Sequence, residues 1–214
     1  MQPPPPVLTT TTQRPGSTGE HRLQAECGTE ERAARFYDQQ MSDRINPQMR
    51  EFIGRMEMAF IATADANGEC DASFRAGPPG FVRVLDERTV GWPDYRGNGV
   101  MASAGNITEN PHVGILFLDF QRDLVGLHVN GAAEILDPAV FEDRWSDDRL
   151  DIEPGRRAER WIVVTVEEAY IHCSKHIPRL LPAPRHRDWG TDDPAKKGGD
   201  YFGVTAERRA LDAP

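Results

Sequence analysis

Residues 58–76, MAFIATADANGECDASFRA, contain two candidate strands and the turn that joins them. The first strand, 58–65, is apolar and leads to Asn67-Gly68, a strong signal for a tight hairpin turn. The second, 69–76, alternates between two sets of side chains, Cys70, Ala72 and Phe74 on one side and Asp71, Ser73 and Arg75 on the other. The stretch therefore predicts an antiparallel strand pair.

Two helices are predicted before this hairpin. Residues 29–42 are typical of a surface helix, with Thr29 as its N-cap and Glu30 and Glu31 at the positive end of its dipole. A second helix is expected from Pro47 to about Glu57, because Asn46 is a good N-cap and proline suits the first helical position. Its apolar face is formed by Met49, Phe52, Ile53 and Met56.

More strands follow the hairpin. We expect 81–85 to pair with 89–92, 113–119 to pair with 124–136 across a short turn, a helix over 138–145, and a last strand over 160–172. Strands in hairpin order, with helices inserted rather than alternating, disfavour a parallel doubly wound sheet. They favour a mainly β fold with added α, a closed antiparallel barrel with peripheral helices. Strand 113–119 is apolar on both faces, which predicts a second cover, either a helix or a partner subunit.

The composition limits which partners and which cellular location the chain can have. The chain has 214 residues, and its first 25 contain too few aliphatic side chains to fold, so we expect a disordered tail over 1–25. A signal peptide and a membrane-spanning run are not expected. The net charge of −9 argues against a nucleic-acid partner. An odd count of three cysteines without close spacing predicts a cytoplasmic location.

Residues 91–117, GWPDYRGNGVMASAGNITENPHVGILF, place a glycine-rich helix entrance between two strands. We expect the helix to begin near Asn98 or Gly99, where free N–H groups and the helix dipole favour an anion such as phosphate. Ser103 and Asn106 are three residues apart and share a polar face. Val100, Ala104 and Ile107 form the apolar one. An ordinary loop followed by a solvated helix is the alternative interpretation.

From about Asp43 to Lys175 the chain resembles the pyridoxamine 5'-phosphate oxidase-like split-barrel flavoproteins. The resemblance is carried by the segments FIATADANGECDAS, RAGPPGFVRVLD, PD..GN at 93–98, NITENPHVGILFLD and LHVNGAAEILD, in that order. The later AYIHCSKHIPRL is similar to one actinobacterial-style subgroup. The resemblance implies an antiparallel split β-barrel over 26–178 and a C-terminal extension over 179–214, which either is flexible or wraps a partner subunit.

The resemblance also implies a homodimer that binds FMN at the subunit interface and acts on a small molecule. The cofactor-binding residues that it implies are Arg75, Gly80, Phe81, Val82, Trp92, Pro93, Asp94, Asn98, Ser103 and Asn106. Relatives often place Arg or Lys on the phosphate-binding helix, whereas here no cation lies between Arg96 and Arg122. Arg75, Arg83 or Arg96 would have to supply the charge, since charge-assisted hydrogen bonds are about twice as strong as neutral ones.

Near the end of the last strand, His172, Cys173 and His176 invite comparison with a metal site, but two histidines need a third ligand. We expect no metal and assign His172, Lys175 and His176 as candidates for the substrate pocket; a structural role is the alternative. No catalytic side chain is identified. The sequence predicts an FMN-dependent oxidoreductase. The alternatives are a non-enzymatic flavin- or haem-binding sensor and a deazaflavin-dependent reductase.

Overall fold

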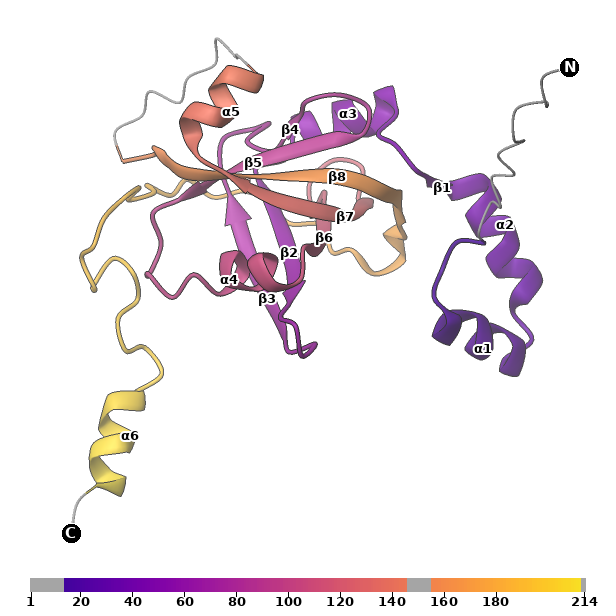
Figure 1. Cartoon of the computed structure of the whole chain (residues 1–214). Coiled ribbons are helices and arrows are strands. Elements are labelled where there is room, and N and C mark those ends of the chain that lie inside the picture. Colours follow the sequence, from indigo (N-terminus) through magenta and orange to yellow (C-terminus); the bar gives the residue numbers. More distant parts are fainter. Residues whose placement is uncertain (1–13, 146–154, 213–214) are drawn as a thin grey trace, which may run out of the picture. The chain divides into compact units, whose positions relative to one another are not determined.

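The computed structural model describes residues 14–145 and 155–212 (Figure 1). The chain divides into two compact units, Met1–Ser42 and Asp43–Pro214. In the described ranges no helix is long and apolar enough to cross a membrane. The division falls after Ser42, seventeen residues beyond the end of the tail expected from the sequence.

The first unit contains α1 (Thr18–Glu26), α2 (Glu30–Gln40) and the short β1 (Met41–Ser42). Residues 18–25 of α1 fall in the range predicted to be disordered, so that prediction is wrong for them; residues 1–13 lie outside the described ranges. A capping box explains the helix: Ser17 Oγ accepts from Glu20 N–H, and the Glu20 carboxylate accepts from Ser17 N–H. Gln24 Nε2 also donates to Tyr37 Oη of α2, at 2.7 Å.

Thr29 occupies the N-cap position of α2, as predicted. Thr29 makes no side-chain capping bond, because its backbone is not in the extended conformation that directs a cap oxygen to the helix (φ −111°, ψ 9°). In the second unit the predicted cap is confirmed. Asn46 Oδ1 accepts from Met49 N–H at 2.8 Å at the start of α3 (Pro47–Gly54), and Phe52 and Ile53 of that helix are buried.

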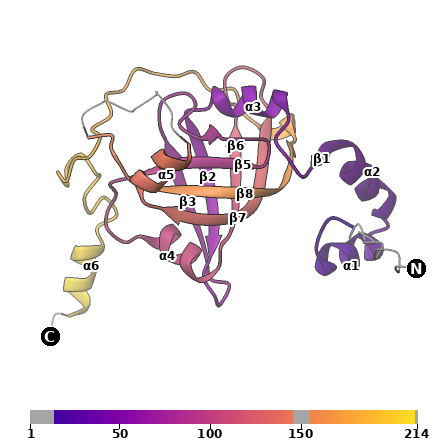
Figure 2. The ribbon, with the colours of Figure 1, turned by 45° about the horizontal axis from the view of Figure 1, so that its top comes forward.

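The second unit is built on an antiparallel sheet with the strand order β3-β2-β6-β7-β8-β5-β4. These strands are β2 (Met58–Ala64), β3 (Cys70–Ala76), β4 (Arg83–Val84), β5 (Thr89–Tyr95), β6 (His112–Leu118), β7 (Gly126–Leu136) and β8 (Ala158–His172). The sheet curls so that β2, β3 and β6 run across β5 and β8 (Figure 2). The mainly antiparallel fold with peripheral helices is thus confirmed, and β3 and β4 are the two ends of the curled sheet.

A continuous apolar core fills the inside of the curled sheet. Its fully buried side chains include Ile53 of α3, Ile61, Trp92, Ile115, Phe117, Val129 and Val164. A second cluster, in which Phe141 of α5 (Pro138–Arg144) stacks on Trp161 at 3.7 Å, lies under that helix. Helix α4 (Ala102–Glu109) connects β5 to β6, and the extension contains η1 (Ser174–His176) and α6 (Val204–Leu211).

Strand β3 alternates as predicted, but its polar side chains are the less exposed set. Asp71, Ser73 and Arg75 are half-buried, whereas Phe74 is 55% exposed. Phe74 pairs with Phe60 of β2, and the rings lie 5.6 Å apart on the outer side of the sheet. The strand therefore presents polar groups toward α4 and apolar groups outward.

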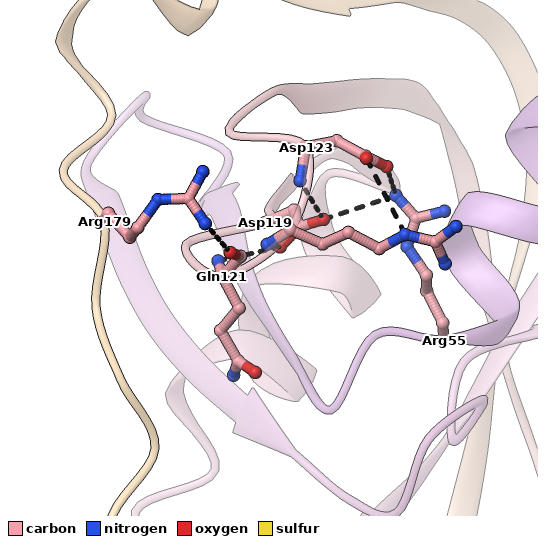
Figure 3. A network of polar contacts seen from close by, with 6 residues as sticks. Arg55, Asp119, Gln121, Asp123 and Arg179 are labelled. Atoms are coloured by element: carbon pink, nitrogen blue, oxygen red, sulfur yellow. Dashed lines mark hydrogen bonds and ion pairs between the residues drawn. The ribbon is translucent and has the colours of Figure 1, made fainter.

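The turn between β6 and β7 is organised by Asp119, which is only 6% exposed (Figure 3). Its carboxylate accepts from the N–H groups of Gln121, Arg122 and Asp123 at 2.9–3.0 Å and from Arg55 at 3.3 Å. Burial alone would raise the pKa of Asp119, but these donors prevail and lower it to about 2.

We expect Asp119→Asn to lower the free energy of unfolding by about 2 kcal/mol at pH 7. A folded-state pKa of about 2 against 3.8 unfolded means that the folded state holds the carboxylate ionised. The stabilisation is present above pH 4 and is lost as the pH falls toward 2. Urea unfolding at pH 7 and pH 3 measures it, and the difference between wild type and variant should shrink at pH 3. A constant difference would contradict this account.

Candidate functional site

The candidate site lies where the two ends of the sheet approach each other. Strand β3 is at one end of the strand order and β5 is next to the other end. Side chains rather than ladder hydrogen bonds join them: Arg75 of β3 lies 3.7 Å from Asp94 of β5. Helix α4 follows β5 and contacts both β2 and β3, as the labels in Figure 1 show. The split of the barrel is therefore bordered by a helix N-terminus and charged side chains.

Asp94 is held between two arginines. Its carboxylate lies 3.7 Å from Arg75 and 3.9 Å from Arg160 of β8, and its side chain is 15% exposed against 28% for each arginine. Arg75 Nη1 also donates to Ser73 Oγ at 2.8 Å. Two guanidinium groups therefore flank one carboxylate, and Glu159 of β8 also acts on that carboxylate electrostatically.

One feature of this group favours an additional oxygen ligand. Burial and Glu159 raise the pKa of Asp94, although Arg75 and Arg160 act to lower it. Arg75 Nε is buried and has no hydrogen-bond partner in the described ranges. A buried donor without an acceptor is costly, and an oxygen ligand at this point would remove the cost.

Ser103 and Asn106 of α4 face the sheet. Ser103 is 6% exposed, and its hydroxyl donates to Asp71 Oδ2 at 3.1 Å. Asn106 Nδ2 donates to Thr63 Oγ1, also at 3.1 Å. The predicted shared face of Ser103 and Asn106 is therefore present, but the structure uses it to fix α4 against β2 and β3.

The glycine-rich entrance differs from the prediction. Helix α4 begins at Ala102 rather than near Asn98 or Gly99. Met101, the residue before it, adopts a left-handed conformation (φ 61°), so the helical conformation starts only after Met101. Asn98 Oδ1 accepts from Val100 N–H at 3.0 Å and closes a local turn. Val100 is 72% exposed and does not join Ala104 and Ile107 on the buried face.

The other residues implied for the cofactor lie in the interior beside the split. Phe81, Val82 and Trp92 are at most 4% exposed, and Pro93 is buried. Gly80 has a positive φ of 77°, and a Cβ there would lie 3.0 Å from the carbonyl oxygen of Gly54, so glycine is required by the packing under α3. Trp92 Nε1 is buried without a partner in the described ranges.

The candidates near the end of β8 are not brought together. His172 Nδ1 lies 3.0 Å from His128 Nε2 on the outer side of the sheet, and His128 stacks on Tyr170. Lys175 and His176 are exposed in η1. Within residues 14–145 and 155–212 no group of three His, Cys, Asp or Glu side chains is arranged to hold a metal.

The other two arginines considered for a phosphate are engaged elsewhere. The Arg83 guanidinium lies over the Trp161 ring at 4.7 Å, and Arg96 forms an ion pair with Asp192 of the extension. Arg160, which no sequence pattern singles out, is the second arginine beside Asp94. Its position in the apolar run RWIVV offers no local signal, and only the pairing of β5 with β8, which sets Asp94 opposite Arg160, brings it to the site.

The sequence model of the family described as Pyridoxamine 5'-phosphate oxidase matches residues 45–173, more than half of the chain. No curated protein matches the sequence.

Several solved structures are similar. HupZ of Group A Streptococcus is 24% identical, with 59% of this chain and 93% of that chain covered and a TM-score of 0.44. HutZ of Vibrio cholerae, a haem storage protein, is 15% identical over 60% and 95%, with a TM-score of 0.39. An FMN-binding protein of Syntrophomonas wolfei is 14% identical over 78% and 100%, with a TM-score of 0.46.

Proposed function

Since the chain belongs to the pyridoxamine 5'-phosphate oxidase family, we propose that it is an FMN-dependent oxidoreductase that acts on a small molecule. The observation that carries the proposal is the pair of arginines, Arg75 and Arg160, at the split of the barrel beside the start of α4. Helix α4 itself has no cation, and this pair supplies the positive charge that a phosphate ester needs.

The residues present fit FMN, but Ser103 and Asn106 would not make the direct contacts to it that the sequence predicts. Arg75 and Arg160 would hold the phosphate, and the unpaired Arg75 Nε is a donor ready for it. Ser103 and Asn106 would act indirectly by holding α4 in place through Asp71 and Thr63. The open surroundings of Gly97 and Gly99, where a Cβ would meet no atom within 4 Å, leave room for the ribityl chain.

When bound, FMN supplies hydride and single-electron transfer at its ring. The chain's own part is to bind and orient the cofactor and to keep its phosphate in a site of balanced charge. Asp94 limits the positive charge at the split. Trp92 and Pro93 provide a rigid wall, because both are buried. No side chain is assigned as a general acid or base.

The proposal includes a homodimer. On the outer side of the sheet the register places Phe74, Phe60, Leu116, His128 and Tyr170 in one row across five strands. The exposed fractions of Phe60 and Phe74 are 39% and 55%, large for apolar side chains in a monomer. Burial and the neighbouring His172 lower the pKa of His128, so the row is predominantly uncharged at pH 7. A second copy would cover it, with about 2,000 Å² buried in all.

The proposal also includes a cytoplasmic location, for which the support is that Cys27, Cys70 and Cys173 are free and exposed.

The absorbance spectrum of the purified protein, alone and after incubation with FMN, tests the function. We expect stoichiometric uptake of FMN, a flavin spectrum and its bleaching by dithionite. A protein that takes up no FMN contradicts the proposal. A haem spectrum on incubation with haemin, in place of flavin uptake, would instead identify a haem-binding protein. Binding of FMN without turnover of any reductant would identify a non-enzymatic flavin-binding sensor. Uptake of a deazaflavin but not of FMN would identify a deazaflavin-dependent reductase.

A further inference from the structure

The C-terminal extension forms a pocket with the end of β5. The pocket has a volume of about 330 Å³, and its lining residues from the extension lie between 185 and 197. Tyr95 and Arg96 of the barrel complete the lining. The proposed flavin function does not use this pocket.

Specific contacts hold the extension on the barrel. Arg179 Nη1 donates to Gln121 O at 2.6 Å, on the turn drawn in Figure 3, and Leu180 N–H donates to Phe120 O at 2.8 Å. Further along, Arg187 Nη1 donates to Gly77 O at 3.3 Å. The Trp189 ring then packs edge-on against Tyr95, with 5.4 Å between the ring centroids. The pocket is therefore built from an ordered path of the chain against the barrel.

The pocket concentrates positive charge in an acidic protein. Its lining includes one carboxylate, Asp188, and five Arg or Lys residues. These cations are Arg96, Arg185, Arg187, Lys196 and Lys197. A second carboxylate, Asp192, pairs with Arg96 and Lys197 from the edge. Lys196 Nζ pairs with Asp188 at 2.6 Å. The cations exceed the carboxylates by three, although the whole chain has a net charge of −9.

We propose that this pocket binds a small molecule that carries two or more phosphate groups. An arginine can donate two parallel hydrogen bonds to one phosphate. The excess of three cations matches the several negative charges of a pyrophosphate group better than the one charge of a single carboxylate. The volume accommodates a pyrophosphate group but not a folded polymer, so the ligand is a small molecule. The half-buried Trp189 ring lies beside these cations in the lining, and the Arg156 guanidinium lies over it at 5.5 Å.

The pocket is distinct from the flavin site, although adjacent residues of β5 serve the two. Asp94 faces Arg75 and Arg160, whereas Tyr95 contacts Trp189, and the register of β5 with β8 shifts between Asp94 and Tyr95. The shift turns the two side chains to different partners.

Calorimetric titration of the full chain with pyrophosphate, in the presence of saturating FMN, tests the proposal. We expect one saturable site, and Arg185→Gln combined with Lys196→Gln should weaken it at least tenfold. The matched control is Arg208→Gln combined with Arg209→Gln in α6, which removes the same charge outside the pocket and should leave the affinity within twofold. Circular dichroism establishes that both variants fold.

Three results would overturn the proposal: no saturable binding by the wild type, equal weakening by the control pair, or citrate binding as tightly as pyrophosphate. A second pyrophosphate titration, without FMN and on the Arg75→Gln, Arg160→Gln variant, tests the pocket independently of the flavin proposal. Unchanged pyrophosphate affinity in that variant supports the pocket even if the protein takes up no FMN. Loss of pyrophosphate binding there assigns the anion to the barrel split and removes the basis of the inference.

Discussion

Replacing Arg75 and Arg160 together by glutamine is expected to weaken FMN binding at least a hundredfold. The two guanidinium groups flank Asp94 at 3.7 and 3.9 Å and are the cations nearest the split. A hydrogen bond to a charged group contributes about 1.5–3 kcal/mol, so two of them correspond to at least two powers of ten in the dissociation constant. Quenching of flavin fluorescence on titration measures the affinity.

Two comparisons separate a phosphate contact from a general loss of charge or fold. Riboflavin lacks the phosphate, so its affinity should be the same for the variant and the wild type. Arg122→Gln combined with Arg144→Gln removes the same charge from exposed positions away from the split, and its FMN affinity should be unchanged. Equal weakening of riboflavin and FMN by the Arg75 and Arg160 substitutions would show that these arginines do not hold the phosphate.

The secondary structure was largely predictable because its signals are local. Asn67-Gly68 marks a turn by its own conformational preference, and Asn46-Pro47 marks a helix start in the same way. The orientation of β3 was not predictable from its alternation. Alternation by itself does not say which set of side chains faces the barrel and which faces outward.

The candidate site depended on contacts between residues far apart in the chain. Helical spacing correctly placed Ser103 and Asn106 on one face, but only the packing of α4 on β2 and β3 brings them to Asp71 and Thr63. Arg160 reaches the site through a strand pairing that no local pattern encodes. The short range of sequence signals therefore explains why the spacing on α4 could be predicted, whereas the contacts that Ser103, Asn106 and Arg160 make with other elements could not.

Substitution of Phe60 and Phe74 by lysine is expected to raise the dissociation constant of the homodimer at least a thousandfold. The two rings lie 5.6 Å apart on the outer side of the sheet, next to Leu116 in the strand register. In a two-fold symmetric dimer each substitution occurs twice, so four aromatic rings leave the interface and four charges enter it. Burying one such ring stabilises by about 1.5–3 kcal/mol, and four together exceed the roughly 4 kcal/mol that a thousandfold change requires.

Sedimentation velocity at micromolar concentration measures this effect, with a wild-type dimer and a folded monomeric variant as the expected result. Val140→Lys is the matched control, because Val140 is also an exposed apolar residue, 41% accessible, but lies on α5 rather than on the row. The control should remain a dimer. A variant that stays dimeric would place the interface on another surface, and a monomeric wild type would contradict the homodimer itself. Since both rings lie on the side of β2 and β3 opposite the core, the double substitution removes no core contact, and the variant should keep the thermal stability of an isolated wild-type protomer.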